Sequence, residues 1–341
     1  MRRPSPTALW LGAGAALGAA MFVWVRLSEV GMLLRITPHS AWSCERIAVT
    51  PGPEDLVFDP DADALWVATF DRRVPGGAGE GRLYRYDLDR RTLEDRTPAL
   101  DFPFHPHGVD LWRSPEGERV LAVVNHRSPT DHSVELFSDQ GGAWALRRSV
   151  TGLRSPNDVA IAGVDRFYVT EDHRTSGALR LLEEFAAGQW SDLLMVDEGR
   201  RSVALGGLAY PNGVQLSADG ATLYLTETLG RRLRALDVSP DGSLRPRWQR
   251  DLSAAPDNVE VDETGALWVA AHPKLLDFLA HASDPGARSP SSVLVYSAEG
   301  EALEERWLDD GTLLSGASTA AHRRGITAIG AVFESAFLVC R

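Results

Sequence analysis

Short runs of β-branched and aromatic residues recur along the chain, bounded by turn residues such as Asp219-Gly220 and Thr264-Gly265. Five of these runs resemble one another: Leu65–Ala68, Leu121–Val124, Phe167–Thr170, Leu223–Thr226 and Leu267–Ala270. Further runs of this type lie at Arg82–Tyr86 and Ser292–Tyr296. Apolar segments of this length between turns are typical of β-strands, so the pattern predicts a chain built mostly from short strands.

A second pattern precedes each of the five runs by 11 to 15 residues. It consists of a proline, two residues that are polar or glycine, and a branched apolar residue, and we call it the proline motif. Its copies are Pro53–Leu56, Pro106–Val109, Pro156–Val159, Pro211–Val214 and Pro256–Val259. The prolines recur about every 50 residues, a period typical of propeller blades or of solenoid repeats.

Each repeat unit resembles a small antiparallel sheet of about four strands. A sixth, degenerate unit extends from about Gly316 through Ile326–Gly330 to Cys340. Six such sheets around one axis make a six-bladed β-propeller, so we predict an all-β propeller domain over residues 44–341. The alternative is a linear β-solenoid, for which repeats of this length are long.

The segment from Thr175 to Gly188 departs from the strand pattern, because its apolar residues recur with helical spacing. Ser176 is suited to begin a helix and Gly188 to end it. We therefore predict one amphipathic helix on a loop over the ring. Two interpretations remain open, namely a helix that packs on the propeller, or a lid or membrane-facing surface.

The start of the chain has a different composition. Basic residues precede an uncharged run from Ala8 to Val25, which as a helix extends roughly 27 Å, close to the thickness of a bilayer core. We predict a signal-anchor or transmembrane helix over residues 1–27 and a linker over residues 28–43. This arrangement favours a membrane-anchored protein whose propeller is exported to the periplasm or the cell exterior. If the segment is cleaved as a signal peptide, the protein is secreted.

Composition and charge limit the classes of partner. The chain is 44% apolar and 24% charged, as in ordinary globular proteins, and its formal net charge is −12. Phosphate binding needs clustered Lys and Arg, so the acidic balance argues against a nucleic-acid partner. The chain also has no Gly-x-Ser-x-Gly sequence of the kind that carries a nucleophilic serine.

Cys44 and Cys340 are the only cysteines in the sequence. Export favours a disulfide between them, with two buried free thiols as the alternative. Such a bond would close nearly the whole domain and could contribute on the order of 5 kcal/mol by loop entropy.

The residue after the proline differs in chemistry from one motif to the next: Glu54, His107, Asn157, Asn212 and Asp257. In a propeller the innermost strand of each blade lines the central channel, and a proline suits the start of that strand. Oxygen ligands from several strands, without cysteine, favour Ca²⁺ over Zn²⁺. We predict that one calcium ion is bound by Glu54, Asn157, Asn212, Asp257 and Asn258. The alternative is that each copy is only a turn, where Asn and Asp are common.

Two histidines of the second unit are candidate catalytic residues. His107 lies in the proline motif, and His126 ends the strand that follows it. Together they are suited to a dyad in which His107 acts as a base and His126 orients it.

Other aromatic polar residues give weaker signals. His173 and His272 end the corresponding strands of later units, where they either line the pocket or hydrogen-bond neighbouring carboxylates. With Tyr210 they are the predicted pocket residues. His105 and His132 are expected to be loop residues.

These residues resemble the paraoxonase family of arylesterases and lactonases. The resemblance extends from about Cys44 to Cys340, almost the whole predicted propeller. The matching segments are Glu54–Leu56, Pro106–Gly108, Val123–His126, Val134–Phe137, Pro156–Asp158, Asn212–Gly213, Asp257–Asn258 and His272–Pro273. Propellers of the gluconolactonase and strictosidine synthase type share fewer of these residues.

The resemblance implies two calcium ions in the channel, the first of them bound by the five residues named above. A second, structural ion would be bound by Asp55, Asp158 and the backbone carbonyl of Val109. The resemblance also implies the Cys44–Cys340 disulfide and a retained N-terminal hydrophobic helix, and His107 and His126 match the family's dyad. There are departures: Ala271 replaces a free cysteine of the family, Arg231 lies where animal members carry histidine, and the loop helix differs throughout.

The function hypothesis is calcium-dependent hydrolysis of small-molecule carboxylic esters or lactones. In this hypothesis the ion polarises the carbonyl and His107 deprotonates the attacking water, with Asp257 as the competing base or nucleophile. A second hypothesis is a non-catalytic, calcium-stabilised propeller that binds a partner at the membrane. A third is a non-hydrolytic enzyme of the strictosidine synthase type.

Overall fold

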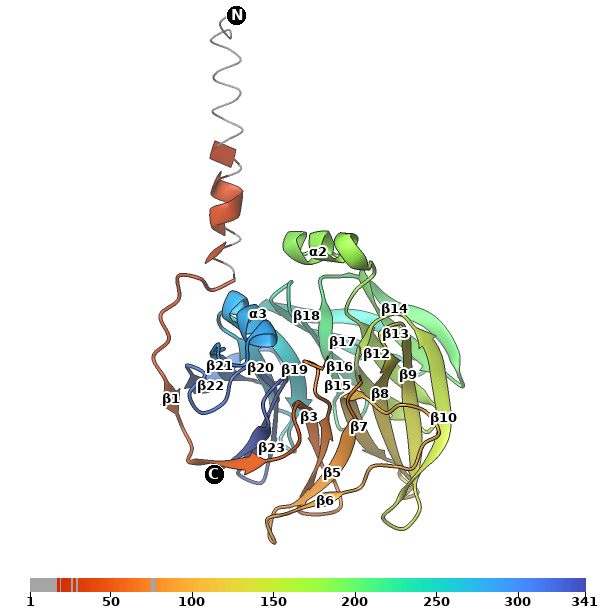
Figure 1. Ribbon diagram of the computed structural model, residues 1–341. Coiled ribbons are helices and arrows are strands. Elements are labelled where there is room, and N and C mark those ends of the chain that lie inside the picture. The colour runs from red at the N-terminus through yellow and green to blue at the C-terminus, as the bar shows by residue number, and fades with distance from the viewer. Residues whose placement is uncertain (1–16, 19, 26, 29, 75–77) are drawn as a thin grey trace, which may run out of the picture.

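The protein is described by a computed structural model that covers residues 17–18, 20–25, 27–28, 30–74 and 78–341. Within these residues the strands form six antiparallel sheets, arranged as blades around one axis (Figure 1). The predicted six-bladed, all-β propeller is therefore confirmed, and the linear solenoid is wrong.

Each sheet is one blade, and the strands follow one another from the axis outward. The first blade contains β3 (Pro53–Phe58), β4 (Ala64–Thr69), β5 (Arg82–Asp87) and β6 (Thr92–Asp95). The second contains β7 (Pro106–Arg113), β8 (Arg119–Ser128), β9 (Asp131–Asp139) and β10 (Trp144–Leu153). The third contains β11 (Pro156–Gly163), β12 (Arg166–Glu171), β13 (Ser191–Asp197) and β14 (Arg200–Leu208).

The remaining blades follow the same order, with additions from the N-terminal part of the chain. The fourth contains β15 (Pro211–Leu216), β16 (Thr222–Glu227), β17 (Arg232–Val238) and β18 (Leu244–Asp251). The fifth contains β19 (Ala255–Val261), β20 (Leu267–His272), β21 (Ser291–Tyr296) and β22 (Ala302–Asp309), with the short β1 (His39–Ser40) at its outer edge. The sixth contains β23 (Ala317–Arg323), β24 (Ile326–Ala331), β25 (Ala336–Cys340) and the N-terminal β2 (Cys44–Ala48).

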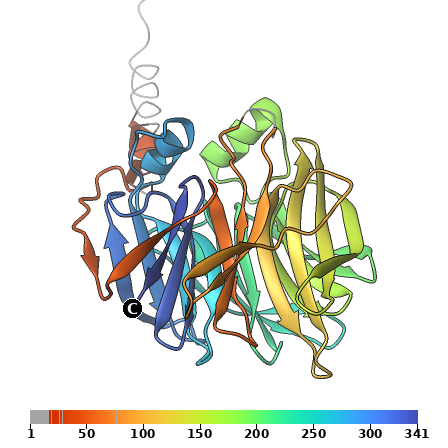
Figure 2. The ribbon, with the colours of Figure 1, turned by 60° about the horizontal axis from the view of Figure 1, so that its bottom comes forward.

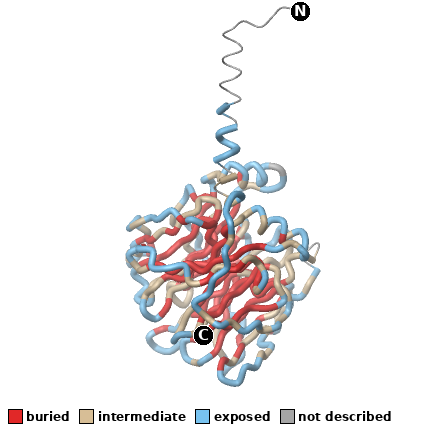
Figure 3. The backbone as a smooth tube through the Cα atoms, turned by 90° about the vertical axis from the view of Figure 1, so that its left-hand side faces the viewer, coloured by how far each residue is buried: buried red, intermediate tan, exposed pale blue. Residues whose placement is uncertain are grey.

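The innermost strands carry the five proline motifs and lie side by side around the channel, in the order β3, β7, β11, β15, β19, β23 and back to β3. The second strands β4, β16 and β20 are buried along their whole length. A neighbouring blade covers each of their faces, which explains why the sequence shows continuous apolar runs there rather than alternation. Figure 3 shows the buried backbone concentrated in the interior of the ring.

Packing between blades supplies the hydrophobic core. Val124 and Val134 of the second blade pack with Val159 and Val169 of the third in one buried cluster. Similar clusters lie between other neighbouring blades, so the core is a ring of interfaces rather than one central mass. The channel itself is consequently left to polar side chains.

The sixth blade closes the ring with both ends of the chain. β2 pairs with β25, and Cys44 lies directly opposite Cys340 in the register. The two cysteines form a disulfide across a sequence separation of 296 residues, as predicted. The alternative of two free thiols is wrong.

Two helices lie on the same side of the ring (Figure 1 and Figure 2). The predicted helix is confirmed as α2 (Gly177–Ala186), with Ser176 at its N-cap. Its C-cap is Ala187 in the left-handed conformation, one residue before the expected Gly188. The second, α3 (Leu275–Ser283), was not anticipated from the sequence.

The predicted signal-anchor lies largely outside the described residues, which lack residues 1–16, 19 and 26. Residues 17–18 and 20–25 are helical, with exposed apolar side chains such as Met21 and Trp24. Among the described residues, no helix is both long and apolar enough to cross a membrane. The predicted linker contains β1, which pairs with β22.

We expect the disulfide to stabilise the closed ring substantially. Because it links residues 296 apart, a Cys44→Ser/Cys340→Ser variant should lose on the order of 5 kcal/mol of unfolding free energy by the loop-entropy estimate. Urea denaturation of both proteins, with and without reductant, measures this loss. Reductant should destabilise the wild-type protein and leave the double variant unchanged. Equal stability of the oxidised wild-type protein and the variant would contradict the expectation.

Candidate functional site

A β-bulge interrupts the register of every inner strand just after its first residues. In β7, Pro106 pairs with Asn125 and Val109 with Val123, so His107 and Gly108 together lie opposite a single residue of β8. The other five inner strands shift at the equivalent point. A bulge breaks the regular alternation of side chains and re-aims the extra residue. This irregularity places the polar residues of the proline motifs in the channel.

Two of the motifs contain glycine because the next inner strand passes too close for a side chain. A Cβ on Gly108 would lie 2.5 Å from Asp158 Oδ1 and 2.6 Å from Asp158 Cα. A Cβ on Gly213 would lie 2.5 Å from the Cα of Asn258. Contacts under 3.0 Å cannot be accommodated by backbone atoms, so these glycines allow the inner strands to approach one another.

The five predicted ligands of the first ion are all in the channel, and each is at most 5% exposed. Asn258 Nδ2 donates to Glu54 Oε1 at 3.3 Å, which joins the fifth blade to the first. Asn157 Nδ2 donates to Asp172 at 3.3 Å, and Asn212 Nδ2 donates to Thr228 at 3.0 Å. The amide nitrogens of all three asparagines are therefore held by neighbours.

One side-chain oxygen in each of four of these residues is left without a hydrogen-bond partner. The buried atoms Glu54 Oε2, Asn157 Oδ1, Asn212 Oδ1 and Asn258 Oδ1 have no hydrogen-bond partner within the described part of the chain. A buried, unpaired oxygen costs roughly 1–3 kcal/mol, so four of them in one site indicate a missing positive partner. Amide and carboxylate oxygens are ligands of hard cations, so the residues fit a bound Ca²⁺.

The five candidate ligands include few carboxylates. Among the residues that the structure describes, no group of three or more His, Cys, Asp or Glu side chains is placed to hold one metal ion. The set here contains two carboxylates, from Glu54 and Asp257, and takes its other oxygens from asparagines. The fit to a cation therefore depends on the unpaired amide oxygens.

Nitrogen atoms of His107 and Arg72 border the site at Glu54. His107 Nε2 lies 3.5 Å and Arg72 Nη2 lies 3.6 Å from Glu54 Oε2. Burial opposes the charged form of Glu54, but His107 and Arg72 outweigh it and lower the pKa of this carboxyl. Glu54 is therefore kept ionised. Arg72 was not anticipated, and no repeated motif in the sequence marks it.

The residues proposed for a second ion also come together. Asp55 accepts a hydrogen bond from Val109 N at 2.7 Å, and Asp158 accepts one from Val214 N at 2.8 Å. Burial, and then a neighbouring carboxylate, raises the pKa of each well above its usual range: Glu54 acts on Asp55, and Asp55 on Asp158. Two buried carboxyls in mutual repulsion favour either a proton or a cation between them, so this pair also fits a cation.

The structure brings the two predicted catalytic histidines into contact. His107 Nδ1 and His126 Nε2 lie 2.8 Å apart. The other nitrogen of His126, Nδ1, lies 2.9 Å from Nδ1 of His132. The expectation that His132 is a loop residue is wrong, because it belongs to β9. The signal was available in the β8–β9 hairpin, where Asn125 pairs with Ser133 and so places positions 126 and 132 side by side.

His105 is a loop residue, as expected, and it precedes β7 directly. Its ring is buried, stacks on Phe70 with centroids 4.3 Å apart, and contacts the backbone oxygens of Gly79 and His126. These contacts fix the position of the segment that precedes β7.

The predicted pocket histidines both pair with acids. His272 Nε2 lies 2.8 Å from Asp257 Oδ2, and its ring stacks on Phe278 of α3. His173 lies 2.7 Å from Asp172 and 2.8 Å from Glu184 of α2, with Tyr210 packed edge-on against its ring. These two histidines therefore connect the channel to the helices above it.

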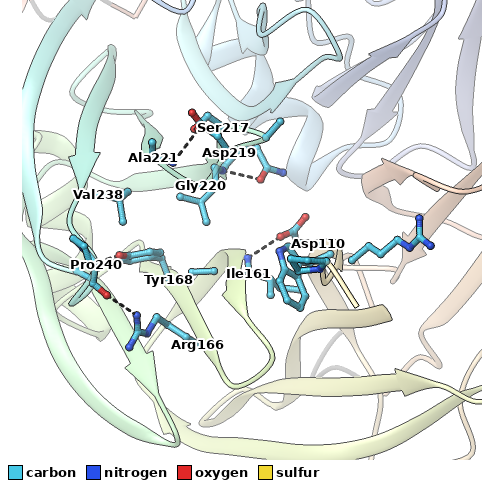
Figure 4. A pocket seen from close by; sticks show the side chains of 18 of the residues that line it. Asp110, Ile161, Arg166, Tyr168, Ser217, Asp219, Gly220, Ala221, Val238 and Pro240 are labelled. Carbon is cyan, nitrogen blue, oxygen red and sulfur yellow. Dashed lines mark hydrogen bonds between the residues drawn. The ribbon is translucent and has the colours of Figure 1, made fainter. Parts of the chain in front are cut away.

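The cavities lie at opposite ends of the molecule. One of about 620 Å³ is lined by the far ends of inner strands, at Asp110 and Gln215, and by Tyr168 of β12, and it contains none of the predicted site residues (Figure 4). Another, of about 480 Å³, lies beside the ends of α2 and α3 and includes Thr228, the partner of Asn212. The second is therefore the cavity that adjoins the candidate site.

The chain is similar in sequence to known proteins over most of its length. Residues 80–341 match the family model described as Arylesterase. Serum paraoxonase/arylesterase 1 of Homo sapiens is 29% identical over 331 residues, covering 91% of this chain and 92% of that protein. Serum paraoxonase/lactonase 3 of Homo sapiens is 25% identical over 346 residues, covering 95% of this chain and 96% of that protein.

Solved structures resemble the fold. A luciferin-regenerating enzyme superimposes with a TM-score of 0.57 and 14% sequence identity, covering 88% of this chain and 95% of that one. At this identity the similarity concerns the propeller architecture alone.

We expect the His173 cluster to make stability depend on pH. Burial opposes the charged imidazole, but the hydrogen bonds with Asp172 and Glu184 outweigh it and raise the pKa of His173 from 6.5 to about 9. Its contribution is therefore complete below about pH 6.5 and lost as the pH rises through about 9. A His173→Gln variant should be less stable than the wild type by on the order of 2 kcal/mol at neutral pH.

Urea denaturation across this pH range measures the contribution of His173. The difference between wild type and variant should shrink as the pH passes about 9. A difference that stays constant at every pH would show that His173 is not held as a cation.

Proposed function

The chain belongs to the arylesterase family, and on that premise we propose that it hydrolyses carboxylic esters and lactones of small molecules. The observation that supports this most directly is the set of unpaired buried oxygens beside an imidazole. Neither feature alone would favour hydrolysis, since a cation site can be purely structural and a buried histidine can be a packing residue.

We propose that the site functions with calcium. Glu54, Asn157, Asn212, Asp257 and Asn258 would hold a catalytic ion. Asp55, Asp158 and the carbonyl of Val109 would hold a structural one. The bound catalytic ion would polarise the carbonyl oxygen of the substrate and stabilise the charge that develops there.

His107 is the proposed general base. Its Nε2 faces the ligand set at Glu54, and its Nδ1 contacts His126, so the free electron pair of Nε2 is directed into the channel. There it can accept a proton from a water molecule that attacks the carbonyl carbon. The contact with His126 fixes the ring orientation and the tautomer that this role requires.

Asp257 is the competing base or nucleophile. Burial raises the pKa of its carboxyl, and the hydrogen bond with His272 opposes that rise. Its Oδ2 is already engaged by His272 at 2.8 Å, which leaves Oδ1 as the atom that could attack or bind the ion. His107 Nε2 lies farther from its nearest carboxylate, 3.5 Å from Glu54 Oε2, and is therefore the better candidate for base.

The helices support a further proposal, that this end of the propeller faces a membrane and that the N-terminal segment anchors it there. The inward face of α2 is polar, since Glu183 accepts hydrogen bonds from Thr175 and Ser191. The outward face is apolar, and its exposed side chains are Leu179, Leu181, Leu182 and Phe185. The ring of Phe185 packs edge-to-face against Phe22 of the N-terminal helix, with ring centroids 6.4 Å apart. This exposed apolar face supports the interpretation of α2 as a membrane-facing surface.

We expect a chelator to abolish hydrolysis of phenyl acetate and of γ- and δ-lactones, and added Ca²⁺ to restore it. Glu54→Gln should lower kcat more than about 100-fold and weaken calcium binding measured by calorimetry, because it removes a charged ligand. Glu198→Gln, at a carboxylate whose side chain is 74% exposed, is the matched control and should change neither. Normal turnover by Glu54→Gln would refute the metal-assisted mechanism. Unfolding on chelation, without any prior hydrolysis, would instead support a non-catalytic propeller.

Measurements of kcat and of calcium binding can also separate the roles of His107 and Asp257. His107→Gln should lower kcat by roughly 10²–10⁴-fold and leave calcium affinity unchanged, since the histidine is a base and not a ligand. Asp257→Asn should lower both. If His107→Gln retains wild-type kcat, Asp257 or another group is the base.

A further inference from the structure

Three histidines of the second blade form one continuous chain of ring contacts. His107 Nδ1 lies 2.8 Å from His126 Nε2, and His126 Nδ1 lies 2.9 Å from His132 Nδ1. The rings of His126 and His132 meet nearly edge-to-face, with centroids 4.8 Å apart. His126 therefore uses both of its nitrogens to contact other imidazoles.

The row of three histidines extends from the buried channel to the surface. At its inner end, His107 Nε2 lies 3.5 Å from Glu54 Oε2, whose side chain is 2% exposed. At its outer end, His132 is half-buried and follows the exposed residues Thr130 and Asp131. The three rings therefore connect the candidate site with solvent along the hairpin end of β8 and β9.

This arrangement differs from that of the other buried histidines. Both nitrogens of His173, and Nε2 of His272, contact carboxylates rather than other imidazoles. His126 contacts imidazoles on both sides, and an imidazole can donate with one nitrogen and accept with the other. Burial, with smaller effects of His107 and His132, lowers the pKa of His126 well below its usual range, so the ring stays neutral and keeps both capacities.

We propose that His132 is the solvent end of a proton relay, His107–His126–His132, that exchanges protons between the site and bulk water during hydrolysis. This inference rests on the proposed function and adds a positioning residue to it. His132 does not touch the substrate but acts through His126.

The relay can be written with every proton accounted for. Before attack, Nδ1 of His107 donates to Nε2 of His126, Nδ1 of His126 donates to Nδ1 of His132, and Nε2 of His132 carries a proton toward solvent. When Nε2 of His107 takes a proton from water, each shared proton moves one ring outward and the Nε2 proton of His132 enters solvent. All three rings are then neutral, each with its other nitrogen protonated.

In the second half of the reaction the protons of the three histidines return to their starting positions. The alkoxide that leaves the acyl carbon takes the proton from His107 Nε2, the shared protons move back one ring, and His132 Nε2 recovers a proton from solvent. The carboxylic acid product ionises after release. The relay thus lets His107 serve as base and then as acid without accumulating charge in a buried site.

His132→Asn is the variant that tests the relay. Its side-chain amide can replace Nδ1 as a hydrogen-bond partner of His126 but cannot carry a proton to solvent. At low buffer concentration the variant should hydrolyse phenyl acetate with a kcat about tenfold below wild type and an unchanged KM. Added imidazole, as a diffusible proton carrier, should restore kcat in the variant and leave wild type unaffected.

His39→Asn is the control, since His39 is exposed and lies on β1, away from the site. It should match wild type with and without imidazole, and the thermal midpoints of all three proteins should agree. An unchanged kcat in His132→Asn, or a loss that imidazole does not restore, overturns the relay while the proposed function stands. A wild-type protein that hydrolyses neither esters nor lactones overturns the proposed function, and the relay with it.

Discussion

The close approach of the inner strands around the channel is the constraint on which both the ring and the site depend. Strand-to-strand contact at Gly108 and Gly213 leaves no room for a Cβ. Carboxylates of one blade then accept hydrogen bonds from backbone N–H groups of the next, as Asp55 does from Val109 and Asp158 from Val214. The bonds that hold neighbouring blades together are therefore made by residues of the proline motifs, which also provide the candidate ligands.

This double use has an electrostatic cost. Several carboxyl groups lie buried along one axis, where desolvation and mutual repulsion both favour the protonated form. A bound divalent cation would offset both effects. The affinity for the cation and the stability of the propeller therefore depend on the same interactions. The contacts of Glu54 with His107 and Arg72 lower the pKa of this carboxyl, which is why it differs from its neighbours.

The sequence was sufficient for the architecture because the repeat itself is visible. Five proline motifs and five buried strands at a common period define the blades, and the paired position of Cys44 and Cys340 defines the closure. The direction of the polar side chains was less accessible, since it depends on a β-bulge that no residue type marks. Arg72 and α3 lie outside the repeat, and His132 becomes visible only from the register of a hairpin.

The relation between the channel and the helices was also beyond the sequence. An amphipathic pattern identifies α2, but not which of its faces is turned inward. In the structure the polar face is the inner one, because Glu183 and Glu184 accept hydrogen bonds from the propeller or pair with it. The hydrophobic face is left outward, opposite to the usual arrangement for a surface helix.

The sixth blade has a consequence for how the protein is made. Its outermost strand, β2, comes from the beginning of the domain, and its other three strands come from the end. A chain synthesised from its N-terminus must therefore keep β2 without its partner β25 until residue 340 is available. During that interval the edges of the open ring are exposed to wrong pairing. Closure of the ring thus requires the last strand, and a truncation near the C-terminus leaves β2 without its partner.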